Sequence, residues 1–170
     1  MNYIEYNMDF ISSDEVLYWQ RRTSDIICEA LENLCGKKFS NHPIIIKKQE
    51  CYVGETGKYY VSLDECHDIT HIYDANQEIY HIPEIKVLLE EREQCYNMIQ
   101  ETKATLTIIE KETFHLGNIR YLDQVIEKLF RERVEEIPKL NETIYRNNER
   151  IKKIKKELTI VFAEFLRRHD

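Results

Sequence analysis

Five side chains that can bind a metal ion occur close together in the middle of this 170-residue chain. Zinc takes four Cys or His ligands in a tetrahedron, and a turn could bring two of these side chains together. Zinc sites usually contain close pairs, such as two cysteines separated by two residues, and none occurs here. We therefore expect no metal and no cofactor, and a Cys/His metal-binding protein stays a second alternative. The five residues are Cys51, Cys66, His67, His71 and His81.

Other catalytic signatures are missing from the sequence. No Gly-flanked Ser or Cys of the strand-to-helix type occurs, as a supported nucleophile would require. Gly54 and Gly57 lack the Lys-Ser/Thr pair of a phosphate-binding loop. The glutamate pairs at 90–91 and 135–136 are adjacent, so on a helix their side chains point apart. The sequence predicts a protein that is not an enzyme.

One strong cluster of positive charge lies near the C-terminal end. On a helix it would flank the aliphatic residues Ile151 and Ile154, whose edges the long side chains can cover. It could bind an acidic partner or a nucleic-acid backbone, but we favour ordinary flanking charge because Glu149 and Glu157 accompany it. The net charge of −7 argues against direct nucleic-acid binding, which needs a basic face. This basic strip comprises Arg146, Arg150, Lys152, Lys153, Lys155 and Lys156.

The first half of the chain is rich in tyrosine. Tyrosine is favoured at recognition surfaces because it contributes contact area with little rotamer entropy. Alternation along a strand would place Tyr59 and Tyr60 on opposite faces, one in the core and the other exposed. The candidate partner-binding surface consists of Tyr52, Tyr59, Tyr60, Tyr73 and Tyr80.

A helix should position the start of the chain. Ser12 or Ser13 can cap it, and Glu15 stands three residues after Ser12, as in a capping box. Apolar residues then recur at steps of three and four as far as Leu34, and Gly36 is a suitable stop. This helix should bury one face.

Residues 43–82 change to a β-prone pattern. Turn residues occur at 54–57 and again at 74–77. We predict an antiparallel meander of three or four strands, covered on one face by the first helix. Residues 1–82 would then form a small α+β head.

Residues 83–170 should be helical. Pro83 suits the first position of a helix, and an apolar repeat of threes and fours follows it. Residues 113–118 contain Gly117 and have the composition of a turn between helices. A third helix is then expected to begin near Ile119.

The clearest pattern is an aliphatic ridge near the C-terminus. Its residues alternate steps of three and four without a slip, as in a coiled coil, and Asn147 within it could fix register. Pro138 either kinks one long helix, giving a helical hairpin, or reverses the chain, giving a three-helix bundle. We favour the hairpin because no Gly or good cap precedes the proline. The helical seam comprises Ile137, Leu140, Ile144, Ile151, Ile154, Leu158, Val161 and Phe165.

Composition sets the class of protein. The chain is 42% hydrophobic and 32% charged with only four glycines, which is typical of an ordered, soluble α+β protein that is mainly α. No apolar stretch approaches the ~20 residues that span a bilayer, and residues 1–10 lack a signal-peptide core. Five cysteines without a tight framework indicate a reducing compartment, so we expect a cytoplasmic protein without membrane contact.

These patterns favour a non-catalytic protein-protein interaction module: an adaptor, assembly or regulatory subunit. It would bind another protein, or itself, through the C-terminal helices, and would dock a second protein on the tyrosine-rich meander. The alternative is a small acidic inhibitor, encoded by a virus or mobile element, of a host nucleic-acid-binding or defence protein. The charge of −7 motivates it, because an acidic protein can occupy a basic channel.

Overall fold

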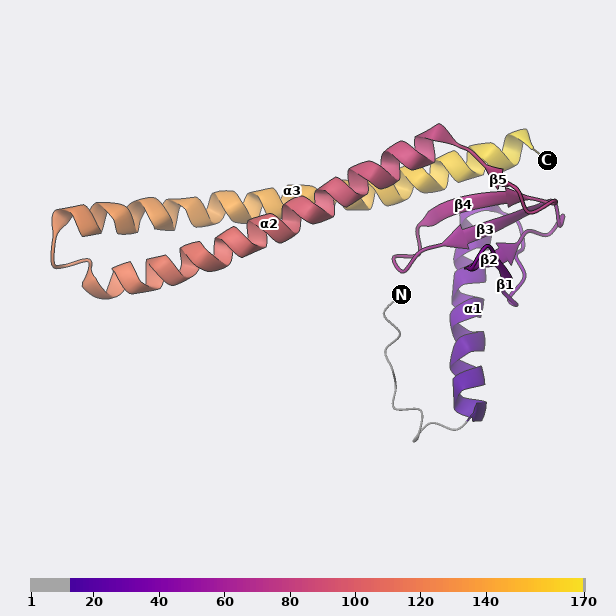
Figure 1. Cartoon of the computed structure of the whole chain (residues 1–170), viewed down its shortest axis with the longest axis horizontal. Helices are drawn as coiled ribbons and strands as arrows, with labels where there is room; N and C mark the ends of the chain where they lie inside the picture. The colour runs from indigo at the N-terminus through magenta and orange to yellow at the C-terminus, as the bar shows by residue number, and fades with distance from the viewer. Residues whose placement is uncertain (1–12, 170) are drawn as a thin grey trace. The chain divides into compact units, whose positions relative to one another are not determined.

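The described part of the chain contains three helices and five strands (Figure 1). The computed structural model describes residues 13–169 and the side chains of residues 21–169. The predicted class is confirmed: a helix, an antiparallel sheet and two long packed helices, mainly α. The elements are α1 (Ser13–Cys35), β1 (Ile44–Ile46), β2 (Gln49–Val53), β3 (Tyr59–Leu63), β4 (Ile69–Asp74), β5 (Ile79–Tyr80), α2 (Pro83–Ile119) and α3 (Gln124–Arg168).

The chain divides into two compact units. The sheet unit contains the residues up to 86 together with those from 157 onward. The hairpin unit contains residues 87–156, which belong to α2, α3 and the turn between them. Both long helices therefore contribute residues to both units.

The sheet has five strands, whereas the sequence predicted three or four. Its five strands lie in chain order, each antiparallel to the next. The additional hairpin joins β1 to β2 through Lys47 and Lys48, which have φ angles of 49° and 66°. A two-residue hairpin turn with both residues at positive φ normally contains Asn and Gly, so two lysines gave no signal. The turns predicted at 54–57 and 74–77 are confirmed.

Helix α1 begins at Ser13 and ends at Cys35, as the capping residues predicted, while Ser12 lies outside the described residues. Gly36 follows with a φ of 68°, and its N–H donates to the Glu32 carbonyl at 2.7 Å. The buried face differs in part from the expected stripe, because Leu34 is exposed. Among its described side chains, those of residues 21–35, α1 buries Ser24, Ile27, Cys28 and Leu31.

Helices cover one face of the sheet. Tyr52, Val61 and Ile72 pair across β2, β3 and β4, so they share this face, and all three are buried. A hydrogen bond joins Tyr52 to Ser24 of α1, which places the first helix against this face as expected.

The end of α3 covers the same face of the sheet. The ring of Phe39 lies 6.0 Å from Tyr59 and 6.3 Å from Phe162 of α3. Tyr80 of β5 meets Phe165 edge to face at 5.0 Å. Aromatic pairs at these separations favour such tilted arrangements over a face-to-face stack.

The two long helices form the hairpin, and the three-helix alternative does not occur. Helix α3 continues through Pro138 for 45 residues. The turn predicted at 113–118 is wrong, because α2 runs on to Ile119. Gly117 is helical, and a Cβ there would lie 3.2 Å from the ring of Phe130, so this glycine permits close packing. The chain turns instead between Ile119 and Gln124, where α3 begins.

Within the described residues, no helix combines the length and the apolar character needed to cross a membrane.

Replacing Lys48 with glycine should stabilise the protein. Lys48 has a φ of 66°, which disfavours any residue with a Cβ, whereas glycine adopts it freely. We expect Lys48→Gly to raise the free energy of unfolding by roughly 0.5–1 kcal/mol. Urea unfolding followed by circular dichroism measures this. Lys58→Gly is the control, because Lys58 is equally exposed without a positive φ, and it should give no gain. Equal effects of the two substitutions would contradict the prediction.

Candidate interaction site

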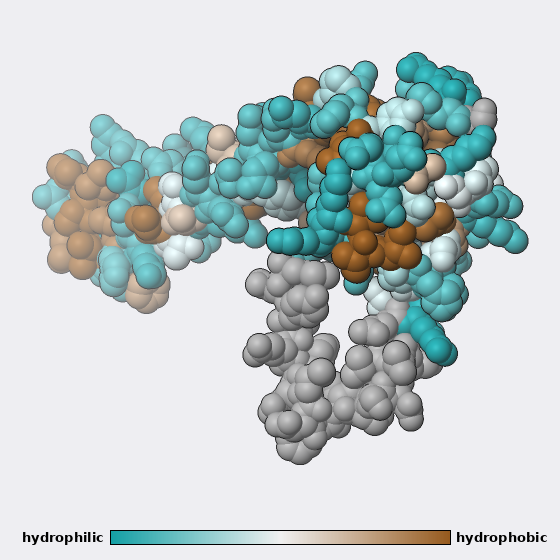
Figure 2. Space-filling model, turned by 45° about the vertical axis from the view of Figure 1, so that its right-hand side comes forward, coloured by the Kyte–Doolittle hydropathy of each residue, from teal (hydrophilic) through white to brown (hydrophobic). Residues whose placement is uncertain are grey.

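Six large apolar side chains are exposed around the turn between α2 and α3, and we call them the apolar tip. In Figure 2 hydrophobic side chains gather at this end of the hairpin. An exposed apolar cluster of this kind is typical of a binding site. The exposed fractions are 69% for Phe114, 42% for Ile119, 85% for Tyr121, 77% for Leu122, 65% for Val125 and 39% for Leu129.

Charge is sparse in the turn that carries the apolar tip. Residues 113–126 contain only two side chains with a formal charge, Arg120 and Asp123. Both act within the turn. Asp123 Oδ1 accepts a hydrogen bond from the Val125 N–H at 2.9 Å, which caps the first turn of α3. Since the cores of protein interfaces are depleted of charge, the composition of the tip suits the centre of an interface.

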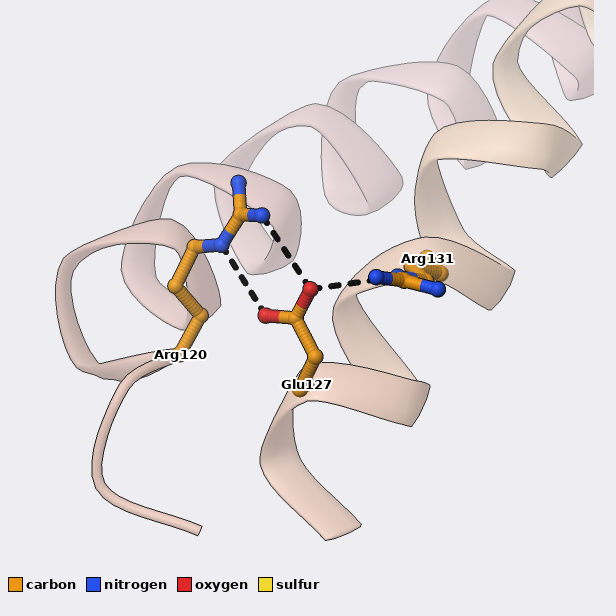
Figure 3. A network of polar contacts seen from close by, with 3 residues as sticks. All are labelled: Arg120, Glu127 and Arg131. Atoms are coloured by element: carbon orange, nitrogen blue, oxygen red, sulfur yellow. Dashed lines mark hydrogen bonds and ion pairs between the residues drawn. The ribbon is translucent and has the colours of Figure 1, made fainter. Parts of the chain in front are cut away.

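A carboxylate holds the two sides of the turn together (Figure 3). Glu127 of α3 accepts two hydrogen bonds from Arg120, from Nε at 2.9 Å and from Nη2 at 3.1 Å. It also accepts one from Arg131 Nε at 3.1 Å. These bonds, chiefly those of Arg120, hold the pKa of Glu127 below its usual range. The forked geometry fixes the distance between the end of α2 and the start of α3.

The aromatic ring of Phe130 packs beneath the turn and supports its backbone. The Arg120 guanidinium lies 4.5 Å from the centre of the Phe130 ring, and Gly117 leaves space for that ring. The Leu122 N–H donates to the Ile119 carbonyl at 3.0 Å. The exposed residues of the tip are therefore presented on a fixed backbone, which lowers the entropy lost on binding.

Ion pairs also join α2 and α3 away from the tip. Arg133 Nε lies 2.8 Å from Glu112 Oε2. Arg150 makes a bidentate pair with Glu91 at 2.6 and 2.7 Å, and it lowers the pKa of that carboxyl. Both pairs are partly exposed, so each contributes little stability and mainly sets register. The buried side chains of the hairpin unit are Leu88, Cys95, Ile99, Thr102, Ile109 and Ile154.

The predicted helical seam lies on α3, and its helical conformation is as expected. Burial varies along it. Ile154, Leu158 and Phe165 are buried, whereas the seam residues from Ile137 to Ile151, and Val161, are half-buried. Asn147 donates to the Thr143 carbonyl of its own helix at 2.9 Å. The seam is thus largely covered within one chain and leaves little surface for a partner.

The basic strip is only partly open to a partner. Arg150 is engaged with Glu91, as described above, and Arg146 with Glu142 at 2.6 Å. Lys152 pairs with Glu149 at 3.0 Å, which raises the pKa of the lysine. Lys153, Lys155 and Lys156 are exposed. At least half of the strip therefore serves ion pairs on or between its own helices.

The tyrosine-rich surface is mostly core. Tyr52, Tyr59 and Tyr73 are buried, and burial raises the pKa of each hydroxyl. Tyr60 is half-buried and Tyr80 is exposed at the sheet edge. A partner could reach only these last two, because the sheet needs the other three rings for its own packing.

No group of three or more His, Cys, Asp or Glu side chains converges on a common point within the described part of the chain. Cys51 is fully buried, and burial raises the pKa of its thiol to about 11. Burial lowers the pKa of His71. Cys66 is exposed in the turn before β4. Cys51 and Cys66 thus lie in different environments, and Cys51 packs as a small hydrophobic residue.

Sequence reasoning missed the apolar tip. The apolar spacing after Ile119 predicts a helix, but it does not indicate that Leu122 and Leu129 are exposed while the ring of Phe130 packs beside Gly117. The available signal was a low content of charge, since residues 113–126 contain two charged side chains in 14, whereas 32% of the whole chain is charged.

Comparison of the chain with protein-family models, with curated proteins and with solved structures finds no match.

Replacing Glu127 with glutamine should destabilise the protein in a pH-dependent way. Because the folded-state pKa of Glu127 is lowered, its ionised form stabilises the fold above the ordinary glutamate pKa of about 4.3. That contribution is lost as pH falls through the folded-state pKa. The urea midpoint of Glu127→Gln should lie below that of the natural protein at pH 7, and the gap should narrow at pH 3.

The control for this measurement is Glu132→Gln, at an exposed position of the same helix. It should change the midpoint little at either pH. A gap for Glu127→Gln that stays constant from pH 7 to pH 3 would show that the carboxylate charge does not hold the turn.

Proposed function

We propose that this chain is a non-catalytic protein-protein interaction module that binds its partner through the apolar tip. One observation carries the proposal: six exposed apolar side chains occupy a charge-depleted turn whose backbone is held by Glu127. Leaving such groups in water costs free energy that a partner surface would recover by covering them.

The other expected surfaces support the tip as the main contact. The helical seam is largely covered, three of the five tyrosines are in the core, and at least half of the basic strip is engaged. Large apolar and aromatic anchors such as Tyr121, Leu122 and Phe114 are the residues that dominate binding energy in protein interfaces. Nothing specific in the geometry favours the inhibitor or the metal-binding alternative.

A reducing, cytoplasmic location forms part of this proposal. The five cysteines all lie within the described residues and none is in a disulfide; burial raises the pKa of the Cys28 thiol to about 11. Cysteines remain as thiols in compartments where glutathione and thioredoxin keep them reduced.

A photo-crosslinking amino acid placed at Val125 should capture protein partners. The side chain at 125 is 65% exposed in the middle of the tip, so a bound partner would lie within reach. We expect discrete protein adducts after irradiation in a lysate of the source cells, detected by a mass shift on a denaturing gel. Leu122→Glu in the same chain should reduce the adduct yield by roughly tenfold, because it puts a charge into the contact.

The matched control is the same crosslinker at Tyr145, which is 64% exposed on α3 outside the tip. It should give few adducts. Equal yields from the two positions, or no adduct from Val125, would rule out the tip as the binding surface.

A further inference from the structure

We infer that the apolar tip binds the apolar tip of a second copy of this chain, forming a symmetric end-to-end dimer. The inference rests on the proposed function and names the partner of the same site. Three observations carry it: the local charge balance, the area of the tip, and the spacing of its exposed residues.

The charge balance makes the tip the region where two copies can best meet. The whole chain has a net charge of −7, which opposes self-association. Residues 110–133 contain five acidic and five basic side chains, so this end of the hairpin is neutral. Contact through the tips brings neutral regions together, while the negative charge lies elsewhere in each chain.

The charged groups of the turn already have partners within the chain, so they do not require a partner protein of opposite charge. Arg120 is paired with Glu127, and Asp123 caps α3. A partner of different chemistry would normally be selected by complementary charge. Because the charges of this turn are paired within the chain, the surface that complements it is another apolar surface with a neutral rim.

The area of the tip is suited to a weak dimer. Burying an aromatic side chain removes about 150–250 Å² from water, and an aliphatic one on the order of 100 Å². Weighted by the exposed fractions, the six side chains offer on the order of 500 Å² per copy. Transient complexes bury less than about 600 Å² per partner and stable ones about 800 Å². The dimer should therefore form at micromolar or higher concentration.

The spacing of the exposed residues fits a helix-to-helix contact. Val125 and Leu129 are four residues apart in α3, which places them on one outward face at the start of that helix, and Leu122 is exposed in the turn just before it. Two such stripes can pack against each other about a two-fold axis, so that each residue makes its contacts twice. Tyr121 and Phe114 then lie at the edges of the contact.

Sedimentation velocity of the purified full chain, from about 1 µM to about 1 mM, tests the inference. We expect the mass to rise with concentration from 20.6 kDa towards twice that value. Val125→Glu should weaken dimerisation by roughly a hundredfold, because each dimer would contain the substitution twice. Added sodium chloride should not weaken it, since the buried surface is apolar and neutral.

Two variants keep the result specific to the tip. Tyr145→Glu adds the same charge at an exposed position of α3, and it should leave dimerisation unchanged. Ile45→Lys places a charge on β1, an edge strand of the sheet on which Ile45 is 67% exposed. If Ile45→Lys abolishes dimerisation and Val125→Glu does not, the inference is overturned and the chains pair through the edges of their sheets. Circular dichroism of each variant confirms that it is folded.

Other outcomes overturn the inference without removing the proposed function. A chain that stays monomeric at about 1 mM, yet gives tip-specific protein adducts of other masses, binds a different protein through the tip. Dimerisation that added salt abolishes would assign the contact to the basic strip and an acidic face. Monomer that floats with phospholipid vesicles through the tip would assign it to a lipid surface.

Discussion

The structure depends on burial of one apolar ridge along α3. Ile154 is fully buried in the hairpin unit, and Leu158, Phe162 and Phe165 are buried in the sheet unit. Truncating a side chain of this kind to alanine typically costs about 2–5 kcal/mol, a large part of the stability of a small domain. Because all four residues belong to one uninterrupted helix, neither unit has a complete core without α3.

The arrangement of polar and apolar side chains at the turn of the hairpin differs from that along the rest of the two helices. Ion pairs such as Arg150 with Glu91 and Arg133 with Glu112 join the helices away from the turn, where Cys95, Ile99 and Ile109 are buried. At the turn the order reverses, because Arg120 and Glu127 hold the backbone while Tyr121 and its neighbours face outward. The proposed interaction rests on this exposed cluster.

Sequence periodicity predicted the order of the helices and the sheet along the chain. It did not predict the environment of individual residues around the turn. The absence of a Gly or a good cap before Pro138 favoured one long helix over a chain reversal, and α3 continues through the proline. Gly117 was misread as a turn residue, because the sequence does not show that a ring from another helix packs against it. The exposure of Leu122 was equally hidden, since the same spacing describes a stripe facing a core and a stripe facing water. Only tertiary structure separates those two cases.

The seven-residue spacing between Arg120 and Glu127 has a consequence for chain length. Loops usually accept insertions because their ends are joined by little more than backbone. Here an added residue would rotate α3 relative to its guanidinium partner and break the forked pair, so the connection should be fixed in length among natural variants. The turn at residues 55–58, which is exposed throughout, is a better place to graft an epitope or fluorescent protein.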